Sequence, residues 1–129
     1  ENEEDYEIRL KTAVNTIVRQ AQPSILTVRN SDGIYYIPIE EIRYIRGVKD
    51  VVTVVWKGGK TIPKSASLQR YEDQFEPYPA FKRVNKNYLL NLRCVRKEVS
   101  GPNLILENGE KIKISYSMAK EVRELLEKL

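Results

Sequence analysis

The pattern of apolar residues changes at Pro23, and this change restricts the fold more than any other feature of the chain. After Pro23, short segments rich in β-branched and aromatic residues alternate with turn signals, which is typical of antiparallel strands. Before it, the apolar residues recur at the spacing of one face of an α-helix, at Leu10, Val14, Ile17 and Ala21. The sequence therefore predicts a helix followed by a mainly β domain.

The two parts are expected to have different roles. Residues 1–23 are interpreted as a linker or interaction helix, because the apolar stripe needs a partner and the acidic start differs from everything after it. A helix packed on its own domain is the alternative. Residues 24–129 have the length of one domain, which can bury a core without metal or disulfide.

Turn-forming residues divide the second part into short strands. Residues 30–33 are a turn signal, and Pro63 limits its segment to an edge or terminal strand. We expect one helical turn at 39–42, a short helix at 65–75 and a helix over 115–129. The predicted strands are 24–29, 33–39, 43–47, 51–56, 60–65, 81–84, 93–99, 103–107 and 110–114.

The end of the chain carries two further local signals. Asn108-Gly109 lies between apolar segments and predicts a β-hairpin with a type I′ turn. Ser117 is a candidate N-cap for the last helix. The buried stripe of that helix is expected to contain Val122, Leu125 and Leu129.

Composition excludes several classes of active site. The chain has no histidine, so the commonest general base and metal ligand is missing and zinc sites of the Cys/His type cannot form. No GxSxG or GxxxxGK[ST] motif occurs. We therefore expect a protein that is not an enzyme and holds no metal or cofactor. No apolar run approaches the roughly 20 residues that cross a bilayer, and the single Cys94 favours a cytoplasmic setting.

Positive charge is concentrated in the β-rich part. Residues 1–24 carry five acidic and three basic side chains, net −2, and the whole chain carries +4, so residues 25–129 carry +6. This distribution favours an anionic partner, with nucleic acid first and a membrane surface second.

The segment 81–97 contains six basic residues and no acidic residue, and the apolar run 88–90 interrupts it. The apolar residues are expected to anchor a loop that pushes Asn85, Lys86 and Asn87 outward. Asparagine and lysine are side chains that hydrogen-bond base edges and phosphates. An ordinary polar hairpin turn is the alternative.

Two single residues allow more than one interpretation. Cys94 follows Arg93, which could favour a reactive thiolate, although strand alternation predicts a buried position instead. Trp56 could stack on a base, but packing in the core or at a sheet edge is the commoner role.

Four motifs in order, "PIEEIRYI", "KSASLQRYEDQF", "FKRVNKNYLLNLRCV" and "LENGEKIKIS", resemble those of the LytTR DNA-binding domain, the C-terminal output module of many bacterial response regulators. The likeness extends from about residue 25 to the end. It implies a mainly β fold: an elongated arrangement of small antiparallel β-sheets with one short internal helix and helices at both ends.

The resemblance also implies a mode of binding. Members of this family bind duplex DNA through loops that enter successive major grooves, at imperfect direct repeats occupied by two copies. It further suggests a receiver domain N-terminal to this fragment, and a standalone regulator without a receiver is the alternative. Carried onto this sequence, the DNA-binding residues are Arg46, Lys49, Asn85, Lys86, Asn87, Ser115, Tyr116 and Ser117, with Lys82 and Arg83 as supporting contacts to the DNA backbone.

The sequence departs from the family pattern at three of these positions. Asn85 stands where the family usually has histidine, Asn87 where it has serine or threonine, and Tyr116 where it often has arginine. The tyrosine can contact a phosphate or a thymine methyl group but brings no charge.

Two rival functions remain open at this point. An RNA-binding domain would display stacking aromatics on a sheet face, for which Tyr35, Tyr36 and Tyr44 are candidates. A basic protein-interaction module would bind an acidic partner or membrane with salt sensitivity but without DNA sequence preference.

Overall fold

The computed structural model describes residues 25–129, and every structural statement below concerns these residues. The predicted helix of residues 1–23 lies outside them. The described chain forms ten strands in three antiparallel sheets, with two α-helices. This agrees with the mainly β fold predicted from the sequence.

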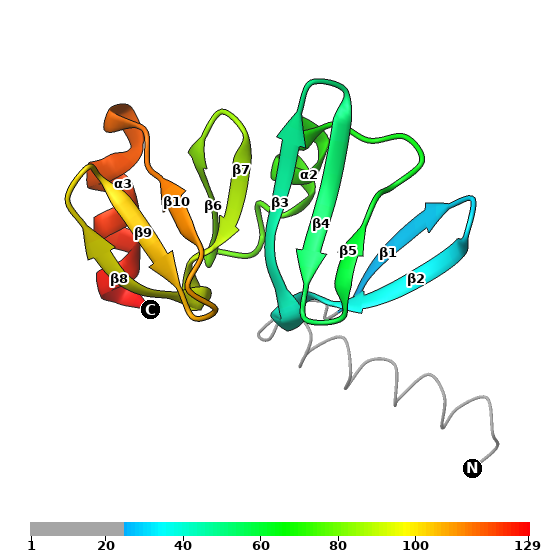
Figure 1. The fold of residues 1–129 in the computed structure, drawn as a ribbon, viewed down its shortest axis with the longest axis horizontal. Helices are drawn as coiled ribbons and strands as arrows, with labels where there is room; N and C mark the ends of the chain where they lie inside the picture. The colour runs from blue at the N-terminus through cyan, green and yellow to red at the C-terminus, as the bar shows by residue number, and fades with distance from the viewer. Residues whose placement is uncertain (1–24) are drawn as a thin grey trace, which may run out of the picture.

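The three sheets follow one another along the long axis of the molecule (Figure 1). A ribbon of β1 (Ile25–Asn30) and β2 (Gly33–Pro38) lies at one end. A five-stranded sheet in the order β5-β4-β3-β7-β6 occupies the middle. Its strands are β3 (Ile42–Val48), β4 (Val51–Trp56), β5 (Gly59–Thr61), β6 (Phe81–Asn85) and β7 (Tyr88–Asn91).

The far end of the molecule holds the third sheet and the last helix (Figure 1). This sheet has the order β10-β9-β8. Its strands are β8 (Val95–Val99), β9 (Asn103–Leu106) and β10 (Lys111–Lys113), and α3 (Tyr116–Lys128) follows. Two short 3-10 turns, η1 (Ile39–Glu41) and η2 (Leu92–Cys94), join the sheets.

The middle sheet is buried on both faces by two separate hydrophobic clusters. In register, Tyr44 pairs with Leu90 and with Val55, and all three side chains belong to the cluster shared with the third sheet. The next register position places Ile45 beside Leu89, and both belong to the cluster shared with the β1–β2 ribbon. Strands buried on both faces read as continuous apolar runs, which explains the sequence of β4 and of residues 88–90.

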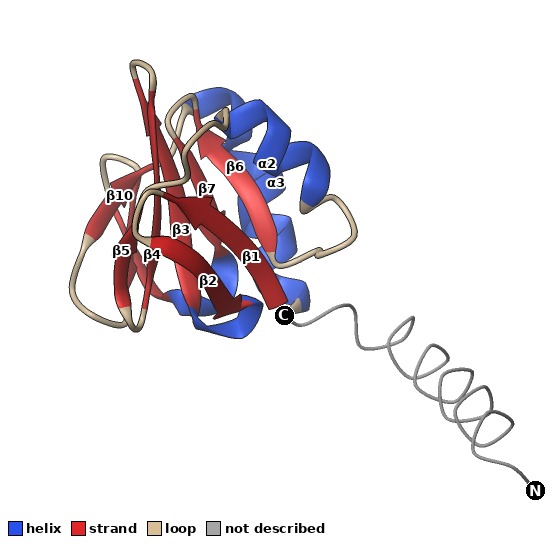
Figure 2. Ribbon diagram, turned by 90° about the vertical axis from the view of Figure 1, so that its right-hand side faces the viewer, coloured by secondary structure: helices blue, strands red, loops and turns tan. Residues whose placement is uncertain are grey.

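Each helix covers one of these clusters. The two helices overlap in the view of Figure 2, but α2 (Leu68–Gln74) belongs to the cluster shared with the β1–β2 ribbon and α3 to the cluster shared with the third sheet. The hydroxyl oxygen of Ser67 accepts the backbone N–H of Arg70 at 3.2 Å and so caps α2. The helix buries Leu68 and Tyr71, and Phe75 beyond it packs edge-on against Phe81 with ring centroids 4.8 Å apart.

The last helix, Tyr116–Lys128, lies within the predicted range 115–129, but its N-cap differs from the prediction. Ser115, not Ser117, occupies the N-cap position, because its N–H is held by the Val84 carbonyl at 2.9 Å and its own carbonyl accepts the N–H of Met118. Val122 is buried as expected. Leu129 is 45% exposed, since it lies beyond the last turn of the helix and outside the core.

The hairpin at Asn108-Gly109 is present, but its predicted type I′ turn is wrong. Such a turn needs positive φ at both central residues, and only Gly109 has it, at φ 90°. The N–H of Gly109 donates to the Leu106 carbonyl at 2.9 Å, and the four residues 107–110 separate β9 from β10. The Asn108 side chain instead accepts the N–H of Glu110 at 3.0 Å.

One ion pair ties the last helix to the third sheet. The guanidinium of Arg123 donates to the Glu98 carboxylate at 2.7 Å, and this hydrogen bond lowers the pKa of Glu98 below its ordinary value of 4.5. A lowered pKa stabilises the folded state above the unfolded pKa, and the contribution is lost as pH falls through the folded value.

We therefore expect Glu98→Gln to be less stable than the parent at pH 7, by a small amount because the pair is solvated. The difference should shrink towards zero as pH falls below about 4. Urea unfolding of both proteins at pH 7 and pH 3 checks this. A difference that is the same at both pH values would contradict it.

Candidate nucleic-acid interface

The three segments predicted to contact DNA lie along one edge of the molecule, at the top of Figure 1. They are the β3–β4 turn, the β6–β7 turn and the start of α3. Their boundaries differ from the prediction. Arg46 is part of β3 rather than of a loop, so Lys49 and Asp50 alone form the first turn. Tyr116 and Ser117 belong to the first turn of α3.

Hydrogen bonds join the three segments into one continuous edge. The N–H of Gly47 donates to the Asn87 carbonyl at 2.8 Å, which links the first turn to the second. The N–H of Ser115 donates to the Val84 carbonyl, and the Asn85 side-chain amide donates to the Lys113 carbonyl at 2.6 Å. These bonds link the second turn to the start of α3.

A groove of about 500 Å³ opens between the first two turns and the start of α2. Gly47 allows β3 and α2 to approach closely beside the groove, because a Cβ added there would lie 3.1 Å from the Cβ of Leu68. Three basic side chains and two neutral polar side chains contribute to the walls. The lining residues are Gly47, Lys49, Asp50, Val52, Ala66, Ser67, Leu68, Arg83, Lys86 and Asn87.

Four of the predicted contact residues have side chains free to meet a ligand. Within the described chain, Lys49, Lys86, Asn87 and Tyr116 form no side-chain hydrogen bond or ion pair. Tyr116 is 85% exposed. Lys49 has φ 56°, a left-handed conformation that costs a residue with a Cβ about 1 kcal/mol. This backbone geometry makes the tight turn between β3 and β4.

Other predicted residues already have partners within the protein. Asn85 uses its amide for Lys113 and its side-chain oxygen for the N–H of Asn87 at 2.8 Å. The ammonium group of Lys82 contacts the Glu121 carboxylate at 2.6 Å. Arg83 donates to two turn carbonyls and to Glu72. Ser115 and Ser117 place their hydroxyl oxygens 3.4 Å apart. Arg46 has no side-chain hydrogen bond or ion pair within the described chain, but it is half-buried.

Sequence reasoning missed Glu72 and Ser67 as parts of this edge. Glu72 lies in α2, 11 positions before the arginine that it contacts, and no pattern in the sequence connects the two. Ser67 both caps α2 and lines the groove. Its place ahead of an apolar helical pattern could have identified the cap, but not the groove.

The tyrosines proposed as an RNA-stacking face do not lie together on an exposed surface. Tyr44 is buried in the middle sheet and its hydroxyl donates to Glu110 at 2.7 Å. Burial and this carboxylate raise the pKa of Tyr44. Tyr36 is 66% exposed on the separate β1–β2 ribbon, and Tyr35 packs against the core. Trp56 also packs there, with its indole N–H donating to Thr61.

Cys94 is buried in η2, not in the strand that the sequence predicted, because β8 begins at Val95. Burial and the nearby Glu107 carboxylate raise the pKa of its thiol, although Arg43 and Arg96 act in the opposite direction. The expected burial of Cys94 is therefore confirmed, and the reactive-thiolate interpretation is not supported.

We expect Cys94 to react with a small aromatic disulfide reagent at least about tenfold more slowly in the folded protein than in 8 M urea at pH 7.5, because the thiol is protonated and shielded. Absorbance of the released thiolate measures the rate. Equal rates in the two states would show that the thiol is accessible in the fold.

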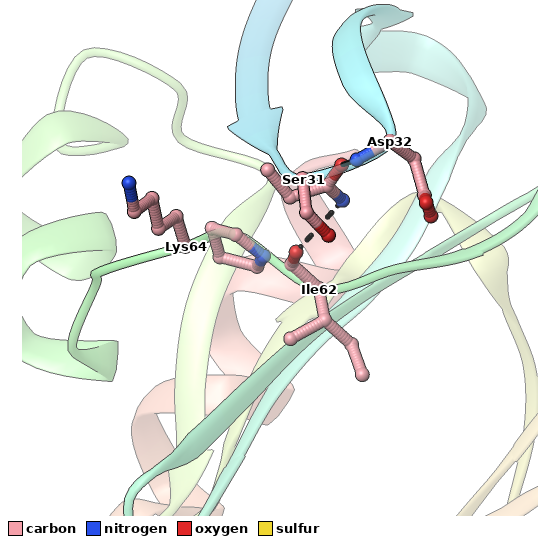
Figure 3. Close-up of a pocket in the computed structure, with 6 residues that line it drawn as sticks. Ser31, Asp32, Ile62 and Lys64 are labelled. Carbon is pink, nitrogen blue, oxygen red and sulfur yellow. Dashed lines mark hydrogen bonds between the residues drawn. The ribbon is translucent and has the colours of Figure 1, made fainter.

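A second open pocket, of about 450 Å³, lies at the turn of the β1–β2 ribbon. Figure 3 shows Ser31, Asp32, Ile62 and Lys64 around it, with the Asn30 side-chain amide donating to the Ile62 carbonyl at 3.0 Å. It contains none of the predicted DNA-binding residues. No group of metal-binding side chains occurs among residues 25–129, and no helix in this range is long and apolar enough to cross a membrane.

The described residues form a β-rich domain in which two turns and the start of α3 share one edge that carries Lys49 and Lys86. The family model for the LytTr DNA-binding domain matches residues 32–127. The chain therefore belongs to the LytTR family of DNA-binding domains, and DNA is the partner that this family implies. The family is one of DNA-binding domains and not of enzymes.

Solved structures include a similar fold. The LytTr DNA-binding domain of a Bacillus cereus protein, named as a methyl-accepting/DNA response regulator, matches with a TM-score of 0.70 and 24% identity. The match covers 81% of this chain and 97% of that one. At this identity, the comparison shows the fold alone. The search of curated proteins finds no match.

Proposed function

We propose that this domain binds duplex DNA in a sequence-specific manner, as the output domain of a bacterial two-component response regulator in the cytoplasm. The observation that carries the proposal is the single edge formed by the two turns and the start of α3. On this edge, the side chains of Lys49, Lys86, Asn87 and Tyr116 have no partners in the described chain. The edge follows the long axis of the molecule (Figure 1), which suits loops that enter successive grooves.

The roles of the edge residues follow from their chemistry. Lys49 and Lys86 neutralise phosphates or donate to guanine, and release of counterions supplies most of the affinity. Asn87 is suited to adenine, which offers a donor and an acceptor together. Tyr116 meets a phosphate or a thymine methyl group. Asn85 acts mainly by shaping the β6–β7 turn, since its side chain bonds Asn87 and Lys113.

The same proposal includes the arrangement of the whole regulator. Two copies of the domain bind imperfect direct repeats, and residues 1–23 connect each domain to a receiver domain that precedes this fragment. Residues 24–129 form the DNA-binding unit. Arg46, Ser115 and Ser117 complete the contact surface, and Lys82 lies beside it in a pair with Glu121.

The test compares binding to a duplex from the promoter of the protein's own operon with binding to a scrambled duplex, at several salt concentrations. We expect preference for the promoter. Lys86→Ala should weaken promoter binding about tenfold and reduce the salt slope by about one.

Lys57→Ala is the matched control, because Lys57 lies in the β4–β5 turn at the opposite end of β4 and its loss changes the net charge equally. It should leave promoter binding within about twofold of the parent. Equal binding to both duplexes, with equal effects of the two variants, would refute sequence-specific readout by the edge. Absence of binding at low salt would refute DNA binding by the domain.

A further inference from the structure

Arg83 contacts three groups that belong to two different elements. Its Nε donates to the Asn85 carbonyl at 3.1 Å and its Nη2 to the Lys86 carbonyl. Its Nη1 donates to Oε1 of Glu72 in α2 at 2.9 Å. The planar guanidinium offers its donors in a fixed fork, so it holds two consecutive carbonyl groups of the turn in one orientation.

The turn held in this way is the one that carries Lys86 and Asn87. The register of β6 on β7 shifts between Arg83 and Asn85, and such an irregularity re-aims the side chains of the bulged strand. The ladder of hydrogen bonds is interrupted there, so the guanidinium replaces part of the support that a regular hairpin supplies. Glu72 in turn fixes the guanidinium from the side of α2.

We propose that Arg83 and Glu72 form a clamp that positions Lys86 and Asn87 for DNA, so that Arg83 is a positioning residue rather than a phosphate contact. The inference rests on the proposed function. The side chain of Arg83 is only 23% exposed and its charge lies 2.9 Å from a carboxylate oxygen. The carboxylate of Glu72 balances the charge of this guanidinium, and its donors are already used within the protein, so it is poorly suited to bind a phosphate. Lys86 beside it is exposed and unpaired in the described chain.

The experiment changes the acidic residue Glu72. Loss of its negative charge should strengthen DNA binding if Glu72 acts only through its charge, and should weaken DNA binding if Glu72 holds the clamp. Removing a negative charge beside DNA strengthens binding by simple electrostatics. If Glu72 holds the clamp, Glu72→Ala instead weakens promoter binding, by about three- to tenfold for the loss of one charge-assisted hydrogen bond. Glu76→Ala, just after α2, is the matched control with the same change in charge. Glu76 has no side-chain partner in the described chain, so binding should stay equal or become slightly tighter.

A double-mutant cycle then identifies what the clamp acts on. In a Lys86→Ala background, Glu72→Ala should have less effect than in the parent, because the positioned side chain is already absent. Arg83→Lys should behave like Glu72→Ala, since an ammonium group cannot hold two carbonyls and a carboxylate in the same plane. Full additivity of Glu72→Ala and Lys86→Ala would overturn the clamp.

Hydrogen exchange of the Asn87 amide provides a readout without DNA. Its N–H is bonded to the Asn85 side chain, and it should exchange faster in Glu72→Ala but not in Glu76→Ala, with the melting temperatures of both close to the parent. If the parent binds no DNA, the proposed function fails and the exchange rates still decide the clamp. If the parent binds and Glu72→Ala binds as tightly or tighter, with unchanged exchange, the clamp is refuted.

Discussion

Leu90→Ala is expected to lower the free energy of unfolding by about 2–5 kcal/mol, which is the range for emptying a fully buried leucine site. Leu90 is completely buried in the cluster shared by the middle and third sheets. Its neighbour Leu89 is 1% exposed and points into the other cluster, so Leu89→Ala should cost a similar amount. Total stability of a domain is only about 5–15 kcal/mol, so either change removes a large part of it.

Chemical denaturation followed by both tryptophan fluorescence and circular dichroism measures these losses. Leu129→Ala is the control, because Leu129 is 45% exposed, and it should change stability by less than about 0.5 kcal/mol. Both core variants should unfold in one transition that the two probes report together. Separate transitions would show that the two clusters unfold independently, in spite of the sheet that they share.

Asn91→Leu is expected to lower the free energy of unfolding by about 2–4 kcal/mol, although it adds apolar volume to a buried position. Asn91 is 2% exposed. Its side-chain amide donates to the Ile42 carbonyl at 2.9 Å, and its oxygen accepts the N–H of Arg93 at 3.1 Å. Leucine leaves both backbone groups without these partners. One group lies at the junction of η1 and β3, and the other lies in η2.

The control is Asn87→Leu, which makes the same exchange at a half-buried turn residue whose side chain has no partner in the described chain. The free energy of unfolding of this variant should stay within about 0.5 kcal/mol of that of the parent. The measurement is the denaturation midpoint, at equal m-value. If Asn91→Leu were as stable as the parent, the two hydrogen bonds would not contribute to the fold.

Local residue patterns were sufficient to predict most strands. Segments such as 51–56 and 103–107 have few polar residues and lie between turn signals, so their identity as strands does not depend on distant contacts. The residues at which helices and strands begin and end were less predictable. The start of α3 depends on the Val84 carbonyl, more than 30 positions away from Ser115, and the turn at Asn108 depends on a side-chain bond that competes with a type I′ geometry.

The location of the candidate interface was predictable, but not which of its side chains face outward and which hold the turn in place. Composition and the family resemblance placed Lys86 and Asn87 at a loop tip, and the structure leaves both side chains without partners in the described chain. Arg83, by contrast, was expected at the DNA backbone. Its contacts with Glu72 and with the turn carbonyls arise from the packing of α2 beside β3 and β7, which no local pattern reports.

The bonds that join the three turns have a consequence for how the domain can evolve. Two of them, from Gly47 to Asn87 and from Ser115 to Val84, use backbone groups alone. The outward side chains at Lys86, Asn87 and Tyr116 can therefore be exchanged while the scaffold that presents them is retained. Under the proposed function, such a surface can change the DNA sequence that it prefers at little cost in stability, and the departures from the family pattern at Asn87 and Tyr116 lie at these exchangeable positions.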